Sequence, residues 1–193
     1  ILCEKPGAIN FKEGQKVIEA VQQAGVFYAE GFMYRCHPQI PALLKLIADK
    51  RIGIITNINS SFGFDMGKTV IKSRLFMKEL AGGAILDVGL YPVSFSRLVA
   101  GAALGKKFMN PVILEANTKI GKTGVDEISH ATMDFDSKII AKASTAIRQN
   151  MDNNALITGT KGSLEMNDPW CPGRDGGPYH SKITIITDNQ KEI

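Results

Sequence analysis

Two short segments carry residue types that suit proton transfer at a carbinol or carbonyl oxygen. In the sequence Glu4-Lys5-Pro6, the proline fixes the backbone after Lys5, so the lysine ammonium is aimed in one direction. In residues 82–92, two leading glycines allow a close backbone approach, and Asp87 and Tyr91 stand four residues apart on one helix face. A free phenol titrates near ~10, and a nearby ammonium favours its phenolate. A tyrosine beside a lysine is therefore a workable proton donor and acceptor.

Each of these features also has a purely structural interpretation. The Glu-Lys-Pro sequence is consistent with a solvent-exposed turn, and the Asp–Tyr pair is consistent with a hydrogen bond along a helix face. Three further candidates for a functional role also have a structural interpretation. Arg35 and Arg74 are consistent with surface residues, and Trp170 is consistent with a core residue.

The sequence offers little that would hold a metal ion or a whole dinucleotide. Its three histidines, His37, His130 and His180, are isolated and form no HxxxH pair, so no metal site is expected. No GxGxxG turn occurs, and Gly105-Lys106-Lys107 lacks the other residues of a phosphate loop. We therefore expect no phosphate cradle within the chain.

The composition is that of an ordinary globular protein. Among 193 residues, 23 Lys and Arg stand against 19 Asp and Glu, and 44% are hydrophobic. The net charge of +4 is spread along the chain, so neither nucleic acid nor a membrane surface is an expected partner. No apolar run approaches the ~18 residues of a membrane span. Three cysteines without a CxxC pair favour a reducing compartment, which predicts a cytoplasmic protein.

The pattern of apolar and turn residues predicts an α+β domain with a largely antiparallel open β-sheet and helices packed on one face. Apolar periodicity predicts helices over residues 11–24 and 38–50, and another over 84–100 with a kink or fresh start caused by Pro92. Residues 63–80 have no clear period. Strands are predicted over residues 26–35, 52–62, 112–120, 127–135, 139–147, 154–158, 162–166 and 183–187.

An open sheet leaves one face available for assembly. If Met133 and Phe135 both lie on the side away from the helices, that face should pair with a second subunit in a twofold homodimer.

The chain also opens without an initiator methionine. Its first residues, Ile1-Leu2-Cys3, are typical of the end of a buried strand. We expect residues 1–6 to be the tail of an N-terminal domain outside this sequence.

Taken together, these pieces resemble the Gfo/Idh/MocA oxidoreductase family, and most closely its dihydrodiol dehydrogenase and glucose/fructose oxidoreductase branch. The resemblance covers residues 1 to about 170. It is carried by Glu4-Lys5-Pro6, the helix ending near Gly25, and residues 30–38, 44–53, 73–76, 80–92 and 159–163.

The resemblance implies that residues 1–193 form the C-terminal substrate-binding and catalytic domain of an NAD(P)-dependent enzyme whose N-terminal dinucleotide-binding domain is missing here. A sugar, a polyol or a cyclic trans-diol would exchange a hydride with NAD or NADP, and the isolated chain would be inactive. The implied catalytic residues are Lys5, Tyr91 and Asp87. The implied cofactor-binding residues are Glu4, Lys5, Pro6 and Arg35, and the implied substrate-binding residues are Arg74, Tyr91 and Trp170. The alternative is a cofactor-free binding or oligomerisation module that keeps the sheet but performs no chemistry.

Overall fold

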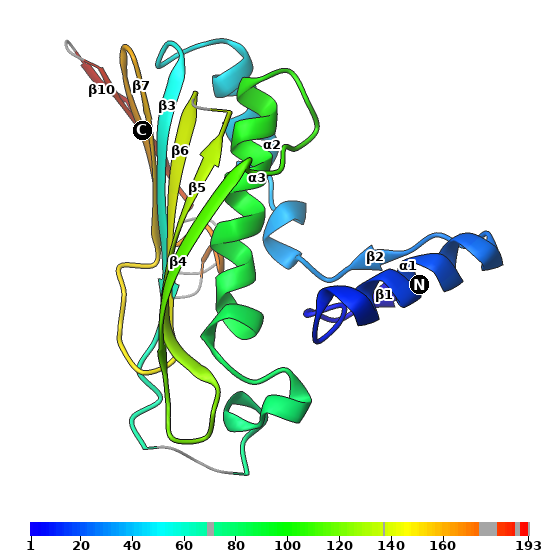
Figure 1. Ribbon diagram of the computed structural model, residues 1–193. Helices are drawn as coiled ribbons and strands as arrows, with labels where there is room; N and C mark the ends of the chain where they lie inside the picture. Colours follow the sequence, from blue (N-terminus) through cyan, green and yellow to red (C-terminus); the bar gives the residue numbers. More distant parts are fainter. Residues whose placement is uncertain (69–71, 137, 174–180, 188–189, 193) are drawn as a thin grey trace.

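The body of the protein is an open eight-stranded sheet, seen edge-on in Figure 1. The computed structural model describes residues 1–68, 72–136, 138–173, 181–187 and 190–192. The strands lie in the order β10-β9-β8-β7-β3-β6-β5-β4. Their bounds are β3 (Ile55–Gly63), β4 (Ile113–Ile120), β5 (Asp126–Phe135), β6 (Ile139–Ala146), β7 (Asn154–Gly159), β8 (Gly162–Asn167), β9 (Ile183–Thr187) and β10 (Gln190–Glu192).

Every neighbouring pair in this sheet is antiparallel except β3 and β6, which run parallel. Short turns join β4 to β5, β5 to β6 and β7 to β8, and such turns require antiparallel pairing. The chain leaves β3 through a helix and the β4–β5 hairpin before it returns as β6, which makes the parallel pair possible. The predicted α+β class and largely antiparallel open sheet are confirmed.

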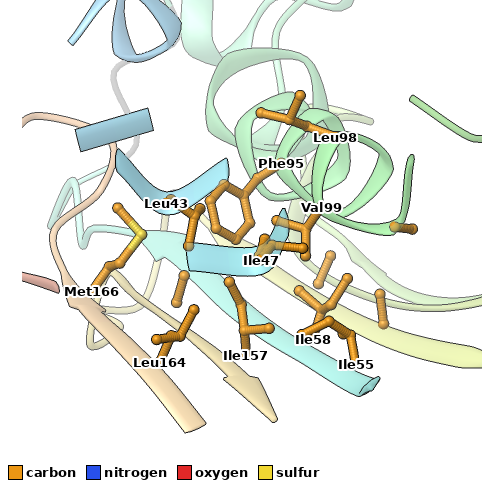
Figure 2. Packing of buried hydrophobic residues seen from close by; sticks show 14 of the residues in the cluster. Leu43, Ile47, Ile55, Ile58, Phe95, Leu98, Val99, Ile157, Leu164 and Met166 are labelled. Carbon is orange, nitrogen blue, oxygen red and sulfur yellow. The ribbon is translucent and has the colours of Figure 1, made fainter. Parts of the chain in front are cut away.

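Two helices, α2 (Gln39–Ala48) and α3 (Leu90–Ala103), cover one face of the sheet (Figure 1). Their apolar stripes face inward, so the core lies between helices and strands. Figure 2 shows this packing, in which Phe95, Leu98 and Val99 of α3 lie above side chains from the central strands. The facing residues are Leu43 and Ile47 of α2 with Ile55, Ile58, Ile157, Leu164 and Met166 of the sheet.

The irregular stretch before α3 contains three short helical turns. They are the 3₁₀ turns η2 (Arg74–Phe76) and η3 (Lys78–Leu80) and the π-helical turn η4 (Ile85–Gly89). The backbone stays helical from η4 into α3, since Gly89 and Leu90 both have αR dihedrals, and Pro92 is the third residue of α3. The kink or fresh start expected beside Asp87 and Tyr91 takes the form of this π turn within one helical run.

The helical run Lys78–Ala103 is long and apolar enough to cross a membrane by length and composition alone. In this protein 67% of its most apolar stretch is buried. Its longest part is α3, the helix that packs on the sheet, and burial in a core accounts for the apolar composition.

A separate unit precedes the body. It consists of β1 (Leu2–Cys3), α1 (Phe11–Ala24) and β2 (Ala29–Glu30), and the two strands pair in parallel. Asn10 caps α1 by accepting from the Glu13 N–H at 3.0 Å, and Gly25 ends it at a φ of 61°. Figure 1 shows the unit projecting from the sheet body. Residues 1–6, expected as the tail of another domain, here belong to a unit that also includes α1 and β2.

The strand predicted over residues 26–35 is mostly wrong. Only Ala29 and Glu30 pair with β1, and the chain then forms the 3₁₀ turn η1 (Met33–Cys36). The turn buries Tyr34 in the core at 1% exposure, so the aromatic residue that suggested a strand is used for packing.

The open face of the sheet carries both polar and apolar side chains. Met133 and Phe135, the residues on which the expected dimer face depended, are buried in the core with the helices, so that condition is wrong. Side chains alternate along a strand, and the register places His130, Thr132 and Asp134 on the opposite face of β5. There His130 Nδ1 lies 2.9 Å from Ser144 Oγ of β6.

Candidate active site

Lys5 and Asp87 meet although they are 82 positions apart. The Lys5 ammonium donates to the Asp87 main-chain carbonyl at 2.6 Å and to its carboxylate Oδ1 at 3.0 Å. Both side chains are largely withdrawn from water, with 16% and 8% exposure. Lys5 follows β1 and Asp87 lies in η4, so the contact joins the N-terminal unit to the start of α3.

A second cation shares the same carboxylate. Arg74 Nη2 of η2 lies 2.7 Å from Asp87 Oδ1, and its side chain is 49% exposed. Gly82 makes this approach possible, because a Cβ there would lie 2.6 to 2.8 Å from the carbonyl oxygens of three residues in 74–77. The predicted role of glycine in close backbone approach therefore agrees with the geometry. Arg74, expected at substrate or cofactor phosphate, is placed where it neutralises Asp87.

Tyr91 lies beside this cluster in the first turn of α3. Lys5 Nζ stands 5.5 Å from the centroid of the Tyr91 ring, within the range of a cation–π interaction. Four other rings surround Tyr91, with centroids 5.3 to 6.3 Å away, and leave it 4% exposed. They are Phe32, Tyr34, Phe62 and Trp170. The structure thus brings Lys5, Asp87 and Tyr91 together.

The environment of Tyr91 raises the pKa of its phenol to about 12. Burial is the largest cause, and the neighbouring Cys171, Asp87 and Glu4 add to it because they disfavour a further negative charge. The neighbouring Lys5 ammonium was expected to favour the phenolate, but burial and the acidic neighbours decide the direction, and the net shift of the pKa is upward. Tyr91 is protonated at neutral pH, which suits a hydrogen-bond donor and general acid.

An alkaline titration checks this assignment on the chain itself. The phenol ionises near ~10 when unfolded and at about 12 when folded, so the free energy of unfolding should be unaffected below the first value and fall as the pH rises towards the second. Tyrosinate absorbance followed against pH should show a late-titrating component that Tyr91→Phe reduces, while buried Tyr34, whose pKa burial also raises, accounts for what remains. A variant that keeps the whole late component would contradict the assignment.

Glu4, Pro6 and Arg35 lie around the Lys5 loop. Glu4 is exposed, and Pro6 and Arg35 line a broad groove between α1 and α3. Sequence reasoning missed Glu30, whose Oε1 accepts the Gly7 N–H at 2.7 Å and ties down the segment after Lys5. Its signal was an acid at the carboxyl end of a strand, since parallel strands bring their carboxyl ends to one edge.

Trp170 does not line an accessible surface. It is fully buried, stacks on Phe62 with ring centroids 5.9 Å apart, and donates from Nε1 to the Ser61 carbonyl at 2.7 Å. The prediction of a substrate contact is therefore revised, because the buried indole packs in an edge arrangement against the Tyr91 ring.

The segment after β1 lies where a ligand can approach the end of a strand. Lys5 and Pro6 follow a parallel strand, the place where α/β sheets bind ligands, and the Lys5 ammonium is held rigidly. Among the described residues no glycine-rich turn joins a strand to a helix in the way a pyrophosphate requires, because Glu4-Lys5-Pro6 occupies the connection after β1. Within the same residues, no three His, Cys, Asp or Glu side chains gather as metal ligands.

Comparison with known proteins agrees with this picture. A family model described as "GFO/IDH/MocA C-terminal domain" matches residues 40–165. The trans-1,2-dihydrobenzene-1,2-diol dehydrogenase of Xenopus tropicalis is 34% identical over 173 residues, which cover 89% of this chain and 50% of the relative. The enzyme of the same name from Mus musculus is 29% identical over 172 residues, 89% of this chain and 49% of the relative. The chain spans about half the length of these relatives.

Solved structures show the same fold. An aldose-aldose oxidoreductase from Caulobacter crescentus, complexed with glycerol, matches with a TM-score of 0.82 and 22% identity over 99% of this chain and 54% of that one. A 3-ketoreductase from Actinomadura kijaniata, in complex with NADP and TDP-benzene, gives 0.82 and 22% over 99% and 55%.

The fold and the site define an open-sheet α+β domain of the kind found in these oxidoreductases. The chain belongs to the Gfo/Idh/MocA family.

Proposed function

We propose that the chain is the substrate-binding and catalytic half of an NAD(P)-dependent oxidoreductase that acts on a sugar, a polyol or a cyclic trans-diol. The observation that carries this proposal is the convergence of Lys5, Asp87 and Tyr91 from three separate elements. A buried proton donor beside a fixed ammonium suits reversible proton transfer at a carbinol oxygen.

Each side chain has a distinct role in this proposal. A bound nicotinamide would supply the hydride chemistry. In the reductive direction, Tyr91 donates its phenolic proton to the carbonyl oxygen of the substrate, and in the oxidative direction the phenolate oxygen of Tyr91 takes the proton from the carbinol hydroxyl. Lys5 stabilises negative charge on the reacting oxygen. Asp87 holds the ammonium and is itself neutralised by Arg74.

The unit β1–α1–β2 supports the proposal that a dinucleotide-binding domain works with this chain. A parallel strand–helix–strand unit is normally part of a larger parallel sheet covered by helices. In α1 no side chain is buried, and Phe11 and Phe27 are each 80% exposed. We call the longer protein that contains both parts the intact enzyme.

The isolated chain should bind NAD and NADP weakly and turn over no substrate. Without a backbone N–H cradle for the pyrophosphate, only the nicotinamide end would meet Lys5, Pro6 and Arg35. Calorimetry with each cofactor is the test. A micromolar dissociation constant for either one would show a complete cofactor site within these residues and overturn the division into halves.

The substrate class rests on the named relatives and on the chemistry of the site. The relatives include dihydrodiol dehydrogenases, and a solved neighbour is an aldose-aldose oxidoreductase. A panel of cyclic trans-diols, aldoses and polyols, assayed with NAD and with NADP, separates the members of the class. Activity on simple monohydric alcohols alone would contradict it.

We also propose that the open sheet face pairs two copies of the intact enzyme. Its polar residues, such as Asn57, Asn59 and Lys142, predict an interface in which hydrogen bonds and ion pairs accompany the apolar contacts of Ile140 and Leu156. Sedimentation at tens of micromolar should show a dimer that dissociates as salt is raised. A monomer at low salt would contradict this proposal.

A further inference from the structure

The shortest bond of the site is made by a main-chain oxygen. Lys5 Nζ lies 2.6 Å from the Asp87 carbonyl and 3.0 Å from the Asp87 carboxylate. A carbonyl inside an α-helix is normally paired with the N–H four residues further on. A local change in helix register would leave the Asp87 carbonyl open to a side-chain donor.

The helix register changes at this point. In the π turn η4, the Leu90 N–H donates to the Ile85 carbonyl, five residues back. Continued by two residues, this register pairs the Asp87 carbonyl with the nitrogen of residue 92, which is a proline and has no N–H. In an α-helical register, Pro92 would instead leave the Val88 carbonyl unpaired.

Pro92 is well placed to maintain this arrangement. It is buried in the first turn of α3, and its own carbonyl accepts the Ser96 hydroxyl at 2.8 Å. Because proline has no N–H, the Asp87 carbonyl has no main-chain donor at this position of the π register.

We propose that Pro92 is a positioning residue for Lys5: by withholding an N–H at the π turn, it keeps the Asp87 carbonyl available to the lysine ammonium. The role of Lys5 in catalysis rests on the proposed function, whereas the positioning itself is a property of this chain. Pro92 contacts no reacting atom. It acts through the Asp87 carbonyl, which fixes the ammonium beside the Tyr91 ring.

The first test measures the Lys5 amine directly in the 193-residue chain. Pro92→Ala and Pro92→Ser both restore an N–H that competes for the Asp87 carbonyl. Acylation with an amine-specific anhydride, read by peptide mass spectrometry, should label Lys5 about two- to tenfold faster in both variants, the factor that one hydrogen bond is worth. Exposed Lys16 is the internal reference, and Pro111→Ala, before β4, is the matched control.

The outcomes separate the positioning from the function. Unchanged Lys5 labelling in folded Pro92→Ala and Pro92→Ser, or an equal rise in Pro111→Ala, overturns the proposal. In the intact enzyme, Pro92→Ala should lower kcat by about the same factor and leave the KM for cofactor nearly unchanged. Faster labelling with an unchanged kcat would uphold the positioning and contradict the catalytic role proposed for Lys5.

Discussion

Replacing Tyr91 with phenylalanine should lower the turnover of the intact enzyme by ~10² to 10⁴ while cofactor affinity changes little. The substitution removes only the hydroxyl, so the ring keeps its contacts with Phe32, Phe62 and Trp170. The loss should appear in kcat, because the proton that Tyr91 gives or takes moves only in the reaction. Steady-state kinetics and a melting temperature measured on the same preparation provide the test.

Tyr34 supplies a matched control for this prediction. Its ring belongs to the same aromatic cluster and is buried, and its hydroxyl donates to Ser94 Oγ at 3.0 Å. Tyr34→Phe should lower the free energy of unfolding by about the contribution of one structural hydrogen bond. It should leave turnover nearly unchanged. Near-normal turnover in Tyr91→Phe would remove Tyr91 from the mechanism and leave Lys5 as the remaining candidate for proton transfer.

Replacing Lys5 with methionine should be at least as damaging to turnover as the loss of the Tyr91 hydroxyl. Methionine is similar in length but lacks the charge, so the reacting oxygen loses its cationic partner. The Asp87 carboxylate would keep Arg74 as its only cation among the described residues. The measurement is kcat in both directions of the reaction, because stabilisation of the oxyanion serves both.

Two further variants interpret the Lys5 result. Lys16→Met removes an exposed lysine paired with Glu13 and should leave turnover unchanged. Asp87→Asn should be milder than Lys5→Met, because an amide oxygen and the main-chain carbonyl still accept from the ammonium. An Asp87→Asn variant that loses more activity than Lys5→Met would show that the carboxylate takes part in the chemistry directly.

The sequence was informative where local chemistry decides the structure. The helix cap at Gly25 and the helix irregularity near Pro92 follow from backbone geometry that few residue types permit, and both are present, the second as a π turn. The strands β5, β6, β7 and β8 were also predictable, because each one buries side chains on a single face, whereas β10 was not predicted.

Tertiary context decided the features that were predicted wrongly. Residues 26–35 have the composition of a strand, but only two of them have a neighbouring strand to pair with, and Tyr34 is drawn into the core instead. Met133 and Phe135 could belong to either face until the helices select one. The pKa of Tyr91 depends on four surrounding rings that come from distant segments, so a neighbouring lysine in the motif was insufficient to give its direction.

The most direct test of the proposed activity follows one atom. The intact enzyme is incubated with NAD or NADP and with substrates of the proposed class that carry deuterium on the oxidisable carbon, and the nicotinamide is then analysed by mass spectrometry. The proposal predicts that deuterium appears in the reduced cofactor and that Tyr91→Phe slows its appearance by ~10² or more. Reduced cofactor without deuterium, or transfer at the same rate in Tyr91→Phe, would contradict hydride exchange at a carbinol carbon assisted by this site.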